Sequence, residues 1–148
     1  MQKEIRHTFS FQHPPEVVWE YLTKKELIAE WLMENDFKLQ LGHKFTFKTK
    51  PKINLGFDGT VYCEVLEIIP LQKLSYSWKG GAGAKPLLDS IVVWTLTPTA
   101  TGTDLLLEHK GFKGVKNYLP YLIMNKGWQK IGKRIGKKMK ERYGISAA

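Results

Sequence analysis

The fold of this chain is decided by residues 117–143, which read NYLPYLIMNKGWQKIGKRIGKKMKERY. At 100° per residue, five apolar residues of this stretch fall within about 80° of one another, which predicts one long helix with a single apolar stripe. The five residues recur at steps of four, three, four and four: Met124, Trp128, Ile131, Ile135 and Met139. The stripe must be buried, so we expect the rest of the chain to supply the surface that covers it.

Glycines and lysines fill much of the remaining helix. Gly127, Gly132 and Gly136 each cost about 1 kcal/mol relative to alanine inside a helix. They either admit bulky side chains from elsewhere or leave space beside the stripe. The lysines lie on the side opposite the stripe: Lys126, Lys130, Lys133 and Lys137.

The net charge of +9 is concentrated at this end of the chain. Residues 115–148 carry nine Lys or Arg against one acid, whereas residues 1–114 carry 14 against 13. Two interpretations remain open. The basic face is either a solvated helix surface or a surface for an acidic protein, anionic lipid or nucleic acid. Exposed aromatics do not interrupt it, which disfavours specific nucleic-acid binding.

The N-terminal part predicts one strand and two short helices. Residues 3–11 alternate between apolar and polar side chains, as in a half-buried strand. Pro15 suits the first turn of a helix that continues through EVVWEYL. Thr23 then resembles the N-cap of a second helix, because Glu26 stands three residues later and would complete a capping box.

From Phe37 onward the apolar period changes to two, which predicts a series of strands. The clearest are at 44–48, 57–65, 74–78, 91–98 and 103–112. The segment GGAGAKP at 80–86 predicts a flexible loop, and residues 99–102 predict a tight hairpin connection. Strands joined by short turns pair antiparallel. We therefore predict an α+β fold, a curved antiparallel sheet of about seven strands wrapped on the C-terminal helix.

Length and composition predict the organisation of the chain. With 148 residues and 43% hydrophobic content, a single domain over residues 1–148 is expected. The chain has no apolar run long enough for a membrane span, and its first residues do not resemble a signal peptide. One cysteine, Cys63, excludes an internal disulfide. We expect a cytoplasmic protein, as a monomer or a dimer.

Five stretches in this order resemble the START-like superfamily, and most closely the family related to the activator of the heat-shock-protein-90 ATPase. They are PPEVVWEYLTKKELIAEWL (14–32), GHKFTF (42–47), PLQKLSYSW (70–78), VVWTLTPTATGTDLLLEHKGF (92–112) and GW (127–128). The resemblance implies a helix-grip fold with a cavity between the sheet and the long helix. It leaves the activity open, because members bind lipids, hormones or polyketides, act as cyclases or dehydratases, or assist chaperones.

Motifs for metal, cofactor or covalent chemistry are missing from the sequence. Its four histidines and one cysteine lack the spacing of a zinc site, and we expect no metal and no cofactor. No GK[ST] follows the glycines at 80–84, which disfavours phosphate binding. Cys63 alternates with Val61 and Val65, as a core cysteine would. We assign no catalytic residue.

His109 is the polar residue that most needs weighing, because it shares a strand face with Leu105 and Leu107. It is either a core histidine satisfied by a hydroxyl such as that of Tyr76, or a general base or ligand anchor. His7 poses the same choice. Because Glu108 falls on the opposite face of the strand, no carboxylate is placed to orient the imidazole.

Three functions follow, and the first is favoured: binding of a hydrophobic small molecule, such as a lipid or an aromatic compound. The second is a chaperone cofactor that meets an acidic protein partner through the basic helix face. The third is a cyclase or dehydratase using His109, which the missing acid–base pair disfavours. Mostly apolar walls with few polar groups suit a ligand pocket, although a plain core has the same composition. The predicted ligand-binding residues are Trp31, Phe45, Phe47, Phe57, Tyr76, Trp78, Trp94, His109, Phe112, Met124 and Trp128.

Overall fold

A seven-stranded antiparallel sheet forms one layer of the computed structural model, which describes residues 2–48, 59–82, 85–113 and 118–144. The strand order across the sheet is β1-β7-β6-β5-β4-β3-β2. The strands from β3 to β7 are neighbours both in sequence and in the sheet, as the short turns predict. The bounds are β1 Gln2–Phe11, β2 Glu34–Asn35, β3 Lys44–Lys48, β4 Thr60–Ile69, β5 Lys73–Ala82, β6 Lys85–Pro98 and β7 Thr103–Lys113.

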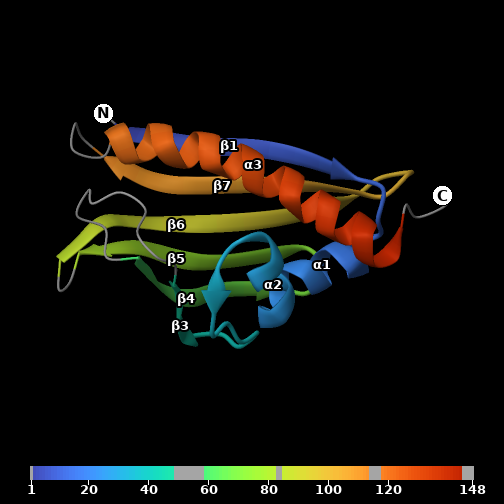
Figure 1. Ribbon diagram of the computed structural model, residues 1–148, viewed down its shortest axis with the longest axis horizontal. Coiled ribbons are helices and arrows are strands. Elements are labelled where there is room, and N and C mark those ends of the chain that lie inside the picture. Colours follow the sequence, from blue (N-terminus) through green and yellow to red (C-terminus); the bar gives the residue numbers. More distant parts are fainter. Residues whose placement is uncertain (1, 49–58, 83–84, 114–117, 145–148) are drawn as a thin grey trace.

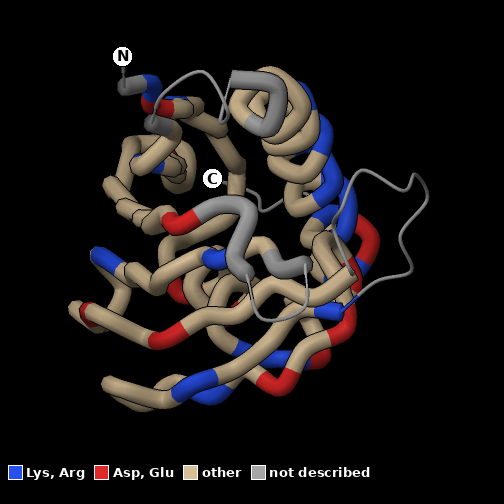
Figure 2. The backbone as a smooth tube through the Cα atoms, turned by 90° about the vertical axis from the view of Figure 1, so that its left-hand side faces the viewer, with Lys and Arg blue, Asp and Glu red and all other residues tan. Residues whose placement is uncertain are grey.

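Within the described residues, three helices cover one face of this sheet: α1 (Pro15–Thr23), α2 (Lys25–Trp31) and α3 (Tyr118–Tyr143). Figure 1 shows α3 running along the sheet beside β1 and β7, with α1 and α2 near its C-terminal end. Seen from the side, the sheet curves beneath α3, whose Lys and Arg residues lie on its outer surface (Figure 2). The predicted α+β helix-grip fold is confirmed.

The concave face of the sheet carries most of the core, because alternate residues of each strand point toward α3. His109 of β7 lies opposite Ile5 of β1 and Val92 of β6, and all three side chains are buried. From α3, the buried residues of the predicted stripe are Trp128, Ile135 and Met139, whereas Met124 and Ile131 are half-buried. The stripe therefore meets the concave face as predicted.

Two local predictions were wrong. Thr23 is the last residue of α1 and does not cap α2; its hydroxyl donates to the carbonyl of Trp19 at 2.7 Å, and Lys24 is the N-cap of α2. A threonine that satisfies its hydroxyl on the preceding turn cannot also cap the next helix. The loop expected at 80–86 is largely strand, because β5 continues to Ala82 and pairs with β6 from Lys85.

Candidate functional site

An aromatic cluster fills the space between the middle of the sheet and α3. The Trp128 ring lies 5.4 Å from Trp78 and 5.6 Å from Trp94, measured between centroids. Trp31 of α2 meets Trp94 edge-on at 5.8 Å. Four tryptophans from two helices and two strands therefore form one contiguous cluster, and such edge and offset contacts stabilise it beyond the burial of apolar area.

His109 lies inside this cluster and is held by hydrogen bonds at both ring nitrogens. Trp128 Nε1 donates to His109 Nδ1 at 2.9 Å. The Ser90 hydroxyl donates to the Trp78 carbonyl at 2.7 Å, so it accepts from His109 Nε2 at 2.8 Å. The imidazole is therefore neutral and protonated at Nε2. The chain of bonds links α3 to β7, β6 and β5.

Burial lowers the pKa of His109 to about 3, because the charged imidazolium would lose its hydration. A histidine that stays neutral and has both nitrogens engaged has no free nitrogen for proton transfer. The geometry fits the core interpretation of His109, with Ser90 rather than Tyr76 as the hydroxyl partner. Tyr76 instead accepts from Trp94 Nε1 at 2.9 Å.

His7 occupies a different environment at the edge of the sheet. Its Nε2 lies 2.9 Å from the side-chain oxygen of Asn125, which belongs to the first half of α3. The side chain is half-buried. His7 therefore joins β1 to α3.

The structure brings most of the predicted ligand-binding residues together, and they are packed against one another in the core. Met124 is the exception, because its side chain is half-buried. Phe57 lies outside the described residues. The remaining nine are each 3% exposed or less: Trp31, Phe45, Phe47, Tyr76, Trp78, Trp94, His109, Phe112 and Trp128. All nine are therefore buried in the packed core.

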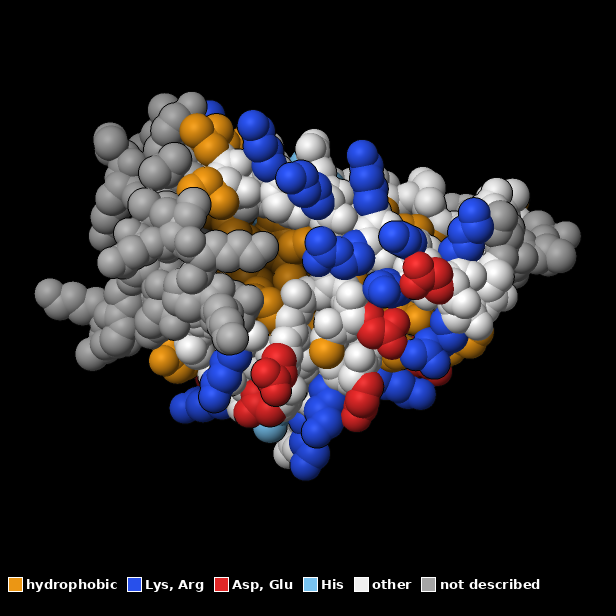
Figure 3. Space-filling model, viewed as in Figure 1, with side chains coloured by type: hydrophobic (Ala, Val, Ile, Leu, Met, Phe, Trp, Pro, Cys, Tyr) orange, Lys and Arg blue, Asp and Glu red, His pale blue; other side chains and the backbone are white. Residues whose placement is uncertain are grey.

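An apolar recess opens beside α3 on the face shown in Figure 3. Met124 and Ile131 of α3 are half-buried hydrophobic residues that pack against the core. Gly127 lies between them, and a Cβ atom built there would meet no atom within 4 Å. One of the three helix glycines therefore leaves space, as one of the two sequence-based interpretations proposed.

The other two glycines admit aromatic side chains from β1. A Cβ atom at Gly132 would lie 2.1 Å from the Phe9 ring, and one at Gly136 would lie 3.0 Å from the Phe11 ring. Phe9 and Phe11 thus press directly on the helix backbone. The β1 flank of α3 is packed, whereas the α2 flank is open at Gly127.

A basic groove lies along α3. It has a volume of about 490 Å³ and lies between α2 and α3. Figure 3 shows blue side chains gathered beside the apolar recess. The residues that line the groove are Glu30, Lys130, Lys133, Arg134, Lys137 and Lys138.

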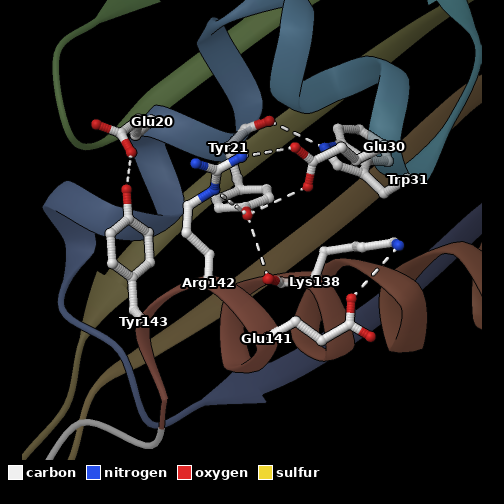
Figure 4. A network of polar contacts seen from close by, with 8 residues as sticks. All are labelled: Glu20, Tyr21, Glu30, Trp31, Lys138, Glu141, Arg142 and Tyr143. Atoms are coloured by element: carbon white, nitrogen blue, oxygen red, sulfur yellow. Dashed lines mark hydrogen bonds and ion pairs between the residues drawn. The ribbon is translucent and has the colours of Figure 1, made fainter.

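A polar network, which we call the clasp and which comprises Tyr21, Glu30 and Arg142, fastens the C-terminal end of α3 to α1 and α2 (Figure 4). Arg142 donates from Nε to the Tyr21 hydroxyl at 2.9 Å and from Nη2 to Glu30 at 2.8 Å. The Tyr21 hydroxyl lies 3.2 Å from the carbonyl of Lys138. Burial raises the pKa of Tyr21, so the hydroxyl keeps its proton and can donate it there.

A neighbouring pair extends this attachment. The Tyr143 hydroxyl donates to Glu20, and this hydrogen bond is the largest cause of the lowered pKa of the Glu20 carboxyl. Sequence reasoning missed the clasp. Tyr21 and Arg142 are separated by 121 residues, and neither stands in a motif that would connect them.

Metal binding and membrane crossing find no support in the described part of the chain. Within it, no three His, Cys, Asp or Glu side chains come together as metal ligands would. Among the described helices, none combines the length and the apolar content needed to cross a membrane.

Comparisons with known proteins agree with the fold. Residues 12–140 match the family model described as Activator of Hsp90 ATPase homolog 1-like protein. Protein MLL2253 from Mesorhizobium loti has a similar structure, with a TM-score of 0.83 and 36% identity over 95% of this chain and 98% of that chain. A search of curated proteins found no match.

Two further solved structures are similar over nearly their whole length. BH1534 from Bacillus halodurans is 26% identical, with a TM-score of 0.72 over 93% of this chain and 98% of that chain. NE0264 from Nitrosomonas europaea is 19% identical, with a TM-score of 0.77 over 94% of this chain and 95% of that chain. At such identity the second likeness shows the fold alone.

Proposed function

The chain belongs to the activator of Hsp90 ATPase homolog 1-like family, and on this premise we propose that it binds a small hydrophobic molecule in the recess between α3 and the sheet. The proposal is carried by the open helix surface at Gly127, which stands between the apolar residues Met124 and Ile131, together with the apolar recess that lies beside α3 in Figure 3. A concave apolar surface beside a rigid aromatic floor is a typical small-molecule site.

The site would bind by removing apolar surface from water. Each buried methylene of a ligand contributes about 0.8 kcal/mol. Trp128 and Trp94 belong to the aromatic cluster behind the recess, so their fluorescence should change when a ligand binds. His109 is neutral, and both of its ring nitrogens are hydrogen-bonded. It therefore holds the packed residues behind the recess in place and transfers no proton.

The test is a thermal-shift and tryptophan-fluorescence titration with 1-dodecanol and 1-naphthol. A ligand at 100 times its dissociation constant adds about 2.7 kcal/mol to the free energy of unfolding. The variant Gly127→Leu fills the recess and should weaken binding at least tenfold. The variant Gln129→Leu adds the same side chain at an exposed helix position and should bind as the natural protein does. No response to either probe, or equal binding by Gly127→Leu, would contradict the proposal.

A second candidate function, a chaperone cofactor, is favoured by the charge of α3. Lys130, Lys133 and Lys137 are exposed and make no ion pair with any described residue. Such a face suits an acidic protein partner. Charge reversal at these three lysines should abolish any acceleration of the ATPase rate of purified heat-shock protein 90. Equal acceleration by the reversed variant, or none by the natural chain, would exclude this role.

A further inference from the structure

The flank of α3 that faces α2 changes from apolar to cationic along its length. Met124, Gly127 and Ile131 follow one another at steps of three and four residues, and Arg134 and Lys138 continue the same row. Residues at these steps lie on one side of a helix. At 1.5 Å per residue, about 10 Å of helix separates Gly127 from Arg134. The recess and the basic groove are therefore consecutive parts of one surface.

The groove holds positive charge that its own residues do not neutralise. Its one acidic residue, Glu30, is already bound by Arg142 at 2.8 Å. Lys138 pairs with Glu141 at 3.4 Å. Among the residues that the structure describes, Lys130 and Arg134 have no acidic partner within ion-pair distance. A guanidinium beside an ammonium, with their counter-charges absent, is an arrangement that binds carboxylate or phosphate oxygens.

We propose that the recess and the groove form one amphipathic site for an anionic amphiphile, that is, an acyl or alkyl chain that ends in a carboxylate or a phosphate. The chain lies in the recess at Gly127, and the anionic end meets Lys130 and Arg134. This inference rests on the proposed function, because it names the class of molecule that the recess takes.

The alternative is that the lysines of α3 only make the surface positive. Both cases attract anions from solution, but they differ in position. A built site depends on Lys130 and Arg134 beside the recess, whereas a diffuse field depends equally on any two cations of the helix. Lys126 and Lys140 are exposed on α3 and do not line the groove, so they provide the comparison.

The experiment compares dodecanoate and dodecyl phosphate, each below its micelle concentration, with 1-dodecanol below its solubility limit, by tryptophan fluorescence and calorimetry. We expect the two anions to bind at least tenfold more tightly than the alcohol. The double variant Lys130→Gln/Arg134→Gln should lose this tenfold advantage and still bind 1-dodecanol as before. The control Lys126→Gln/Lys140→Gln removes the same charge and should keep the advantage. Raising the salt concentration should reduce the advantage without removing the binding of the alcohol.

The outcomes separate this inference from the proposed function. Equal affinity for dodecanoate and 1-dodecanol would overturn the anionic site and leave the hydrophobic site in place. Equal losses in the two double variants would also overturn it, because the effect would then be one of net charge. If none of the three probes binds, the proposed function fails as well. A difference between dodecanoate and dodecyl phosphate would decide which anionic end the groove prefers.

Discussion

The two flanks of α3 are packed differently, although both contain glycine. On the β1 flank, Phe9 and Phe11 press against Gly132 and Gly136, and a Cβ atom at Gly132 would overlap the Phe9 ring. On the α2 flank, Gly127 faces open space between half-buried apolar residues. Three glycines at similar cost to the helix thus serve two purposes. One kind lets strand side chains approach the helix backbone, and the other leaves the helix surface open.

The largest loss of stability is expected at the packed β1 flank of α3. Gly132→Leu forces Phe9 out of place, and overpacking of this kind costs about 3 kcal/mol of the free energy of unfolding. Chemical denaturation measures the change. Phe9→Ala in the same chain should restore part of the loss by making room. If Gly132→Leu is as stable as the natural protein, the description of this flank is wrong.

His109→Leu tests the inward side of the helix, between the two flanks. The substitution leaves Trp128 Nε1 without its acceptor, and a buried unpaired donor costs about 2 kcal/mol.

The same variant should change the pH dependence of stability. The pKa of His109 is lowered from 6.5 to about 3 in the folded protein, so between these values the unfolded state binds more protons. Stability from His109 is therefore complete above pH 6.5 and decreases on acidification toward pH 3, by up to about 1.4 kcal/mol per pH unit. The advantage of the natural protein over His109→Leu should shrink between pH 6.5 and pH 4. An advantage that does not change over this range would contradict the neutral, buried imidazole.

A smaller loss is expected at the clasp. Tyr21→Phe removes the hydroxyl that accepts from Arg142 and lies beside the Lys138 carbonyl, which should cost about 1 kcal/mol. Binding of 1-dodecanol should not change, because Tyr21 does not line the recess. Urea denaturation and the fluorescence titration measure the two quantities in one preparation. A loss of binding would show that the clasp also shapes the recess.

The smallest expected change in the free energy of unfolding is an increase rather than a loss. Gly127→Ala should raise the free energy of unfolding by 0.5 to about 1 kcal/mol, because alanine favours the helix and its methyl group meets no atom. Gly132→Ala at the packed flank is the matched comparison and should not be stabilising. Equal changes at the two positions would remove the distinction between the flanks.

Much of the fold could be predicted because it depends on local periodicity. Alternation in β1 and the steps of three and four residues in α3 report directly which side of each element is buried. The helix predicted over residues 117–143 agrees with α3 at every one of these residues that the structure describes. The wrong predictions concern residues whose local sequence is compatible with two different backbone structures. Thr23 can cap the next helix or bond to the preceding turn, and glycines at the end of β5 can turn or pair.

The site could be predicted less well, because its contacts depend on strand register and on tertiary approach. Ser90 reaches His109 from the neighbouring strand, and the nearby hydroxyl of Tyr76 faces Trp94 instead. The predicted aromatics do come together, yet composition could not distinguish a cavity wall from a packed core. Nor could spacing alone show which glycine of α3 stays open.

The position of β1 has a consequence for how the protein folds during its synthesis. The first strand of the chain pairs with β7, with Gln2 opposite Lys113, and it also packs against the last helix. Until the final third of the chain has left the ribosome, β1 has neither its sheet neighbour nor its helix. Contacts between such distant segments slow folding and leave an apolar strand exposed meanwhile. β7 and α3 must therefore be synthesised before β1 can be covered, and during this interval the nascent chain most needs protection from aggregation.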